Sequence, residues 1–202
     1  MSSVAISGNA SGAGVFTIAA PNSASNFTLT LPTNTGTMIT TASTGQVIPK
    51  AALPTGSVLQ VVNVQSGAVA TGTTIIPSDD TIPQITEGTE YITLAITPTS
   101  ATSKLLIQVV WMGSTTSPSC TIALFQDATA NALAATISSA PAAQLTTLPL
   151  NYFMTAGTTS STTFRLRFGS GAAATTTTNG QSGGRFFGGV ANTSITISEV
   201  AA

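Results

Sequence analysis

Short runs in which apolar residues alternate with threonine or serine recur along the chain, and they constrain its fold more than any other feature. Residues 90–97 read Glu-Tyr-Ile-Thr-Leu-Ala-Ile-Thr, and residues 193–200 read Thr-Ser-Ile-Thr-Ile-Ser-Glu-Val. A period of two places alternate side chains on opposite faces of a half-buried β-strand. Clusters of Gly, Pro, Asn and Ser separate the runs, and no amphipathic helical stripe lies between them. The sequence therefore predicts an all-β fold.

The longer runs predict the strands of one globular head. We expect strands at residues 57–64, 90–97, 104–112, 121–125, 145–154, 162–168 and 193–200. They recur roughly once per 12 to 15 residues, a spacing typical of an antiparallel β-sandwich, and among sandwiches we favour a jelly roll. Residues 104–112 are nearly continuously apolar, which predicts a central strand covered on both faces. The alanine-rich residues 128–135 are interpreted as a loop leading into a strand, with a short helical turn as the alternative.

The first 50 residues differ from the rest of the chain. No charged residue occurs from Val4 to Ile48, and the apolar runs there, such as residues 27–31, are short. Strands with so little apolar surface cannot build a core within one chain. We therefore predict an extended strand-and-turn attachment segment at residues 1–50, which needs other chains as partners, and a β-sandwich head at residues 51–202.

Charged residues are scarce, because the 202 residues include 5 Lys and Arg, 6 Asp and Glu, no His and one Cys. The lack of His excludes a Ser-His-Asp triad, a Cys-His pair and a His metal ligand. Cys120 has no partner for an intrachain disulfide and is predicted to be a buried packing residue. The scattered cations form no basic patch for nucleic acid, and no apolar run approaches the about 20 residues of a membrane-spanning helix. We therefore expect no catalytic residues, no metal or cofactor, no nucleic-acid binding and no insertion into a membrane.

The low charge also bears on assembly. Exposed strands with few Lys residues aggregate in a free monomer, and surfaces near zero charge associate readily. A closed homo-oligomer buries such faces, and a threefold axis suits an attachment segment made of three interleaved chains. We expect a homotrimer. The alternative is that the Thr and Ser hydroxyls alone keep a monomer in solution.

Four stretches of the chain, in this order, resemble parts of tailed-bacteriophage fibre and head-fibre proteins. Residues 14–40 resemble the repeated strand-and-turn segments of a fibre shaft, with the phrases Gly-Val-Phe-Thr-Ile-Ala-Ala-Pro-Asn-Ser and Phe-Thr-Leu-Thr-Leu-Pro-Thr-Asn-Thr-Gly. Residues 53–62 resemble the joint between shaft and head. Residues 96–107 resemble a phrase of the C-terminal domains, and residues 193–200 resemble their last strand.

The resemblance implies a structural protein of the virion, usually a homotrimer. Its N-terminal part would be attached to other virion proteins of the capsid or tail, and its head would contact a host surface glycan or protein. Because the shaft spans only residues 1–50, a short fibre or a capsid decoration element is favoured over a full-length tail fibre. A receptor-binding tip of a tail fibre and a polysaccharide-cleaving tail spike are the alternatives.

One stretch is a candidate for recognition. Residues 170–184 are rich in Gly, Ala, Thr and Ser, and long loops on rigid sandwiches often carry recognition. We predict a flexible loop there, with Asn179, Gln181 and Arg185 as receptor-binding residues. A plain connecting loop is the alternative.

Two further predictions concern side chains within the expected strands. Arg165 and Arg167 alternate on one strand face and are predicted to form ion pairs between subunits, while pairing within one subunit to an acid such as Glu90 stays open. Trp111 ends the most apolar strand, so core packing is favoured over stacking on a sugar ring.

Two acidic pairs are candidates for a metal site or for catalysis. Asp79 and Asp80 lack the surrounding ligand spacing of a calcium loop, which favours a solvated loop. Glu87 and Glu90 flank a turn at Gly88 without surrounding aromatic residues. That setting favours a turn cap or a salt bridge over the acid and base of a glycosidase.

Overall fold

The computed structural model describes residues 11–12, 24, 53–139 and 141–202. The chain divides into two units, Met1–Gln46 and Val47–Ala202. Apart from residues 11–12 and 24, the predicted attachment segment lies outside the described residues, as does its boundary at residue 50, and both stay predictions.

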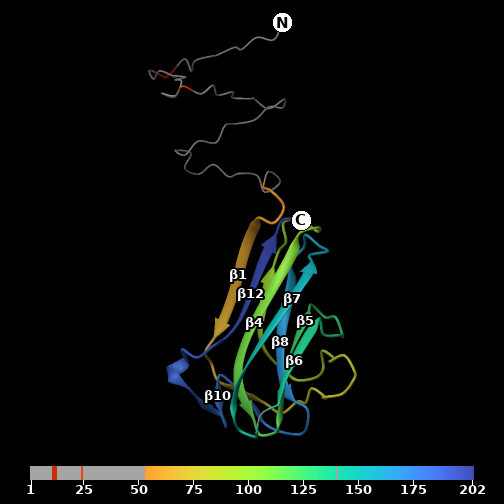
Figure 1. The fold of residues 1–202 in the computed structure, drawn as a ribbon, viewed down its shortest axis with the longest axis vertical. Coiled ribbons are helices and arrows are strands. Elements are labelled where there is room, and N and C mark those ends of the chain that lie inside the picture. Colours follow the sequence, from red (N-terminus) through yellow and green to blue (C-terminus); the bar gives the residue numbers. More distant parts are fainter. Residues whose placement is uncertain (1–10, 13–23, 25–52, 140) are drawn as a thin grey trace. The chain divides into compact units, whose positions relative to one another are not determined.

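The described head consists of two antiparallel sheets (Figure 1). The first sheet contains β1 (Val58–Ser66), β2 (Ala70–Gly72), β4 (Lys104–Thr115), β7 (Leu145–Thr155), β9 (Thr176–Thr178) and β12 (Thr193–Val200). The second sheet contains β3 (Thr89–Ile96), β5 (Ser119–Gln126), β6 (Ala134–Ser139) and β8 (Thr162–Ser170). A small hairpin of β10 (Gly180–Gln181) and β11 (Gly184–Arg185) and a 3₁₀ turn, η2 (Phe187–Gly189), precede the last strand.

The order of the eight longer strands is that of a jelly roll. The first sheet runs β1-β12-β4 with β7 on the other edge of β4, and the second runs β3-β8-β5-β6. Numbered along the chain, these strands form the orders 1-8-3-6 and 2-7-4-5, which is the arrangement of a double-sheet jelly roll. The predicted fold class is confirmed, and all seven predicted strands are present within three residues of their expected bounds.

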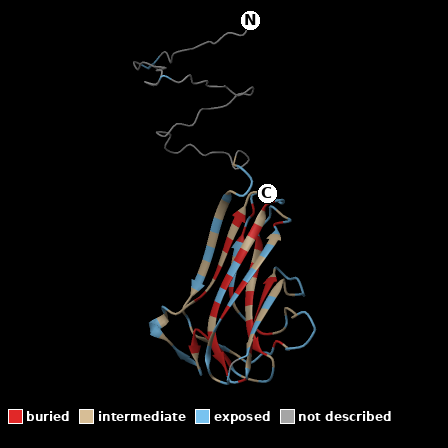
Figure 2. Cartoon of the chain, in the orientation of Figure 1, coloured by how far each residue is buried: buried red, intermediate tan, exposed pale blue. Residues whose placement is uncertain are grey.

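The core lies between the two sheets, where inward residues of alternate strand positions meet (Figure 2). Trp111 is fully buried and stacks on Phe168, with ring centroids 6.1 Å apart, and its indole N–H donates to the hydroxyl of Thr178. Cys120 is buried as predicted, and burial raises the pKa of its thiol to about 12. Core packing of Trp111, rather than exposure to a sugar, is what the structure shows.

The outer faces of the two sheets are covered differently. The segment of residues 73–87, between β2 and β3, lies over the second sheet, where Ile76 and Ile85 pack on Ala123 and Phe125. Strand β5 is therefore buried on both faces.

The expectation that residues 104–112 are covered on both faces is not met within the described chain. Strand β4 is central, but Gln108 and Val110 point to an exposed outer face. The described covering segment lies over the other sheet, and an apolar run alone does not say which of its two faces a loop will cover.

Candidate functional site at the distal end of the head

The register of β1 and β12 defines two ends of the head. Val58 pairs with Val200 at one end and Ser66 with Thr193 at the other. Because the described head begins at Leu53 and the chain finishes at residue 202, both of its termini lie at the first end, which we call the proximal end (Figure 1). The opposite end, where β1 leaves and β12 begins, is the distal end.

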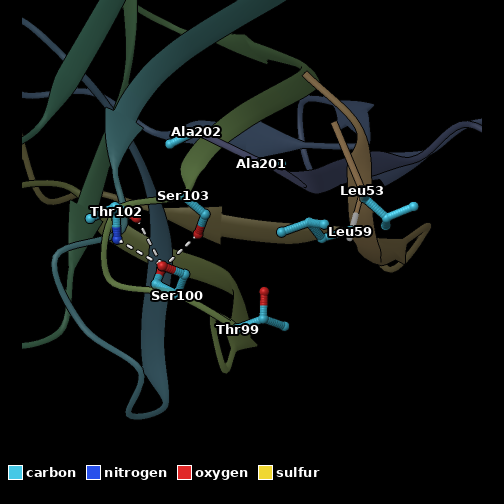
Figure 3. Close-up of a pocket in the computed structure, with 8 residues that line it drawn as sticks. All are labelled: Leu53, Leu59, Thr99, Ser100, Thr102, Ser103, Ala201 and Ala202. Atoms are coloured by element: carbon cyan, nitrogen blue, oxygen red, sulfur yellow. Dashed lines mark hydrogen bonds between the residues drawn. The ribbon is translucent and has the colours of Figure 1, made fainter. Parts of the chain in front are cut away.

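The proximal end has a cavity of about 270 Å³. It is lined by Leu53, Leu59, Thr99, Ser100, Thr102, Ser103, Ala201 and Ala202 (Figure 3). The Ser100 hydroxyl lies 2.9 Å from the Thr102 hydroxyl, and the Ser103 hydroxyl donates to the Ser100 carbonyl at 2.7 Å. The Gly56 amide donates to the Ala201 carbonyl at 2.9 Å, which fixes the start of the head against its end.

The buried carboxylate of Glu199 lies beside this cavity. It accepts hydrogen bonds from the amide and hydroxyl of Thr99, both at 2.7 Å, and from the Ser103 hydroxyl and the Gln60 side-chain amide, both at 2.6 Å. Burial acts to raise the pKa of Glu199, but these hydrogen bonds outweigh it and lower the pKa to about 2. Glu199 is therefore ionised at neutral pH and fastens the β3–β4 loop to β1 and β12.

At the distal end, β10 and β11 form a tight hairpin. Its two turn residues, Ser182 and Gly183, have φ of 49° and 82°. Positive φ at both positions matches the type I′ turn that suits the twist of a hairpin. Arg185 leaves the hairpin exposed, whereas Gln181 is partly buried and its side-chain amide donates to the Ala143 carbonyl.

Asn179 lies beneath this hairpin, and the prediction that it binds a receptor needs correction. It is fully buried, its amide nitrogen lies 2.6 Å from the Ser66 carbonyl and 2.7 Å from the Tyr91 hydroxyl, and its oxygen accepts from the Thr193 hydroxyl at 2.9 Å. These bonds join β1, β3 and β12, so Asn179 supports the distal end and presents no surface to a partner.

The expectation of a flexible loop at residues 170–184 also needs correction. Residues 176–178 form β9, which pairs with both β2 and β4 and is buried. A threonine run has no alternation of apolar and polar side chains, so its sequence does not separate a strand from a loop.

The most exposed apolar side chains of the described head lie just after the hairpin. Phe187 and Val190 are 77% and 78% exposed, and Phe187 has a φ of 48°. A bulky residue in this left-handed region is uncommon and needs support from its surroundings. That support includes Gly67, where an added Cβ would lie 1.7 Å from the Gly189 carbonyl oxygen, so the two backbones touch. We call residues 185–190 the distal knob.

Sequence reasoning found Arg185 but missed Phe187 and Val190. The sequence pattern that could have indicated them is the Phe-Phe pair placed between two Gly-Gly pairs. Glycine pairs favour turns, so aromatic residues between them are expected on a turn at the surface and not in a strand of the core. Ring packing of Phe186 and Phe187, with centroids 6.0 Å apart, helps to shape the knob.

Arg165 and Arg167 form their ion pairs within one chain. Each guanidinium lies 3.3 Å from a carboxylate oxygen of Glu90, on the outer face of the second sheet. Arg167 also donates to the carbonyls of Glu87 and Gly88 at 2.8 and 2.9 Å. The geometry thus favours the pairing within a subunit that the sequence left open.

The other acidic candidates have local partners. Asp79 accepts hydrogen bonds from the amide and hydroxyl of Thr81, which lower its pKa, and Glu87 accepts from the amide of Gln84 at 2.9 Å. The described residues contain no group of three or more His, Cys, Asp or Glu side chains that could hold a metal ion. Within the same residues, no helix has the length and apolar character needed to cross a membrane.

The chain is similar to several solved structures at low sequence identity, and two of them are described below. No protein-family model matches the chain, and no curated protein matches it significantly. The Eiger TNF protein of S. frugiperda has a TM-score of 0.40 and 10% identity, over 70% of this chain and 93% of that one. The enzymatically active domain of tailspike protein 4 of bacteriophage CBA120 has a TM-score of 0.27 and 15% identity, over 62% of this chain and 20% of that one. Neither TM-score is high enough to carry an argument, so the jelly-roll assignment rests on the strand order.

Proposed function

We propose that the chain is a structural protein of a bacteriophage virion, a short fibre or capsid decoration element that displays its head as a homotrimer. Residues 1–50 would hold it to capsid or tail proteins, and the distal knob would contact the host surface. The observation that carries this proposal is the placement of the knob at the opposite end of the jelly roll from Leu53, where the preceding chain joins the head. A head mounted at its proximal end presents the knob outward.

The chemistry of the knob fits a binding role. Exposed apolar side chains are often sites of interaction when they cluster. Arg185 adds a guanidinium, and no carboxylate within the described residues forms a salt bridge with it. An aromatic ring beside a free guanidinium suits a host glycan or a protein with acidic groups.

We also propose that the protein binds without catalysis. Five of its six acidic residues have structural contacts in the described head, including the buried Glu199 and the Glu90 that pairs with two arginines. A polysaccharide-cleaving tail spike would shorten host capsular or cell-wall glycan during incubation with the purified protein, whereas we expect the length distribution of the glycan to stay unchanged.

The virion assignment is tested by immunogold electron microscopy. Antibodies raised against the head are applied to particles purified from the phage that encodes the chain. We expect gold on the capsid or at the tail of intact particles, and the position distinguishes a decoration element from a tail-fibre tip. Particles that carry no label, while the antibody still recognises the purified protein, would contradict the assignment.

The binding role of the knob is tested on host cells. The fluorescently labelled protein is compared with a Phe187→Ser/Val190→Ser variant, and Ile137→Ser serves as a matched control because Ile137 is also an exposed apolar residue, at 50%, but lies on β6. We expect about a tenfold or larger loss of cell binding for the knob variant alone. Equal binding by both variants would show that the knob is not the contact.

A further inference from the structure

The outer face of the first sheet, which we call the bare face, is built from four strands in continuous register. One row across β1, β12, β4 and β7 contains Val61, Ser198, Leu106 and Phe153. The next row contains Asn63, Thr196, Gln108 and Asn151. Val61 and Phe153, at the two edges of the first row, are 56% and 59% exposed.

Within residues 53–139 and 141–202, no segment covers the bare face as residues 73–87 cover the second sheet. The segment of residues 73–87 packs on the second sheet, and the cluster of Arg165, Arg167 and Glu90 lies on that sheet as well. Lys104 is the one charged residue of the rows on the bare face, and its ammonium donates to the Thr155 hydroxyl at 2.7 Å. A sheet face with exposed Val and Phe side chains and so little charge has the character of a protein–protein interface.

We propose that the bare face is the surface on which three copies of this chain pack around a threefold axis. The inference rests on the homotrimer of the proposed function and adds the contact surface that makes it. A second copy suits this face because Asn, Gln, Thr and Ser side chains both donate and accept hydrogen bonds, so one side of the row can bond the opposite side of the row in a neighbour. A foreign partner selected by charge would find a single Lys there, whereas a copy of this face needs no opposite charge.

The area of the bare face can be compared with the area that a stable protein–protein interface buries. Its strands have 8 to 12 residues. With about 3.4 Å per residue and about 4.8 Å between strands, the face measures roughly 600 Å². Each partner of a standard stable interface buries about 800 Å², and each subunit of a closed trimer has two neighbours. The bare face therefore supplies part of the area that a trimer buries, and its two edges must supply the rest.

The threefold arrangement determines which edges of the bare face come into contact. In a twofold dimer the same patch meets itself, whereas in a closed ring one side of a face meets the opposite side of the next copy. The β1 edge, with Val61, then lies against the β7 edge, with Phe153, of a neighbouring copy.

The first test measures mass in solution for the full chain. We expect the wild type at three times the 20.1 kDa of one chain. Phe153→Arg and Val61→Arg each place an unpaired charge in the interface and are expected to raise the concentration for half dissociation about a hundredfold. Ile137→Arg, at a similarly exposed apolar site on the edge strand of the second sheet, should leave the trimer intact.

The second test uses cysteine crosslinking to read the geometry. Cys120 is the one native thiol, and its burial keeps it from reacting. Val61→Cys/Phe153→Cys, treated with a short bis-maleimide, should give covalent species up to trimer. Each single variant should give far less crosslinking, because its thiols would have no partner thiol across the contact.

The outcomes separate this inference from the proposed function. A wild type of 20.1 kDa overturns both the trimer and the bare-face contact, while virion labelling could still hold. A trimer that both arginine variants leave unchanged overturns the bare face alone. Crosslinking that stops at dimer shows a twofold contact and overturns the threefold arrangement. Loss of folded structure by circular dichroism in one arginine variant leaves the other arginine variant and the crosslinking to decide.

Discussion

The outer faces of the two sheets differ in what covers their apolar side chains. The second sheet is covered by residues 73–87 of its own chain, with Ile76 at 0% exposure, and carries the Arg–Glu cluster. The first sheet presents Val61 and Phe153 to solvent with one Lys nearby. A protein with 5% charged residues cannot protect both faces with charge, so one face is closed by a loop and the other is available for a partner. Changes on the covered face should therefore alter the stability of each subunit, and changes on the bare face should alter assembly.

The largest effect is expected from breaking the cover of the second sheet. Phe125→Ala removes a fully buried ring that Ile76 and Ile85 pack against. Deleting a buried aromatic side chain costs about 3–5 kcal/mol through lost burial and the cavity left behind. Urea unfolding of the full chain measures it, and a loss below about 1 kcal/mol would mean that the covering segment contributes little.

A smaller effect is expected at Glu199, which is buried on the inner side of the first sheet. The carboxylate holds Gln60 of β1 and the β3–β4 loop, and its pKa falls from 4.5 to about 2 on folding. A lowered pKa in the folded state means that the stabilisation is present above pH 4.5 and is lost as the pH falls toward 2. The shift corresponds to about 3 kcal/mol at neutral pH.

The measurement for Glu199 is the free energy of unfolding of the wild type and of Glu199→Gln across this pH range. We expect the variant to be about 2–3 kcal/mol less stable at pH 7 and the difference to shrink toward pH 2, because the neutral amide accepts fewer hydrogen bonds than the carboxylate. A difference that does not depend on pH would show that the charge of Glu199 is not the cause.

The smallest effects are expected in the Arg–Glu cluster. Arg165 is 32% exposed, so Arg165→Ala should cost less than about 1 kcal/mol. Arg167 is 17% exposed and also bonds the carbonyls of Glu87 and Gly88, so Arg167→Ala should cost about 1–2 kcal/mol. Thermal unfolding of the two variants compares their losses of stability. Dissociation of a trimer by either change, with stability unaltered, would instead support the predicted ion pairs between subunits.

Much of the jelly roll could be predicted because its signal is local. Alternation along residues 90–97 and 193–200 gives the strands directly, and the absence of helical stripes gives the class. The threonines of β9 have no alternation, so the strand was missed. The covering of β5 by residues 73–87 was also missed, because it depends on where a loop returns in three dimensions.

The candidate site was predictable in part for the same reason. The stretch ending near Arg185 was recognised from its composition, but the burial of Asn179 depends on bonds to residues more than 80 positions away in β1 and β3. Whether Arg165 pairs within one chain depends on the register that sets β3 beside β8, and a sequence pattern does not specify register between distant strands.

The pairing of β1 with β12 also orders events during synthesis. The first long strand of the head takes its ladder partner from the last strand, with Val61 opposite Ser198. Such long-range pairing makes folding slow, because a large loop must close before the contacts form. The head can therefore complete its first sheet only after β12 has emerged from the ribosome. Contacts between heads that need this sheet should then form only after β12 has been synthesised.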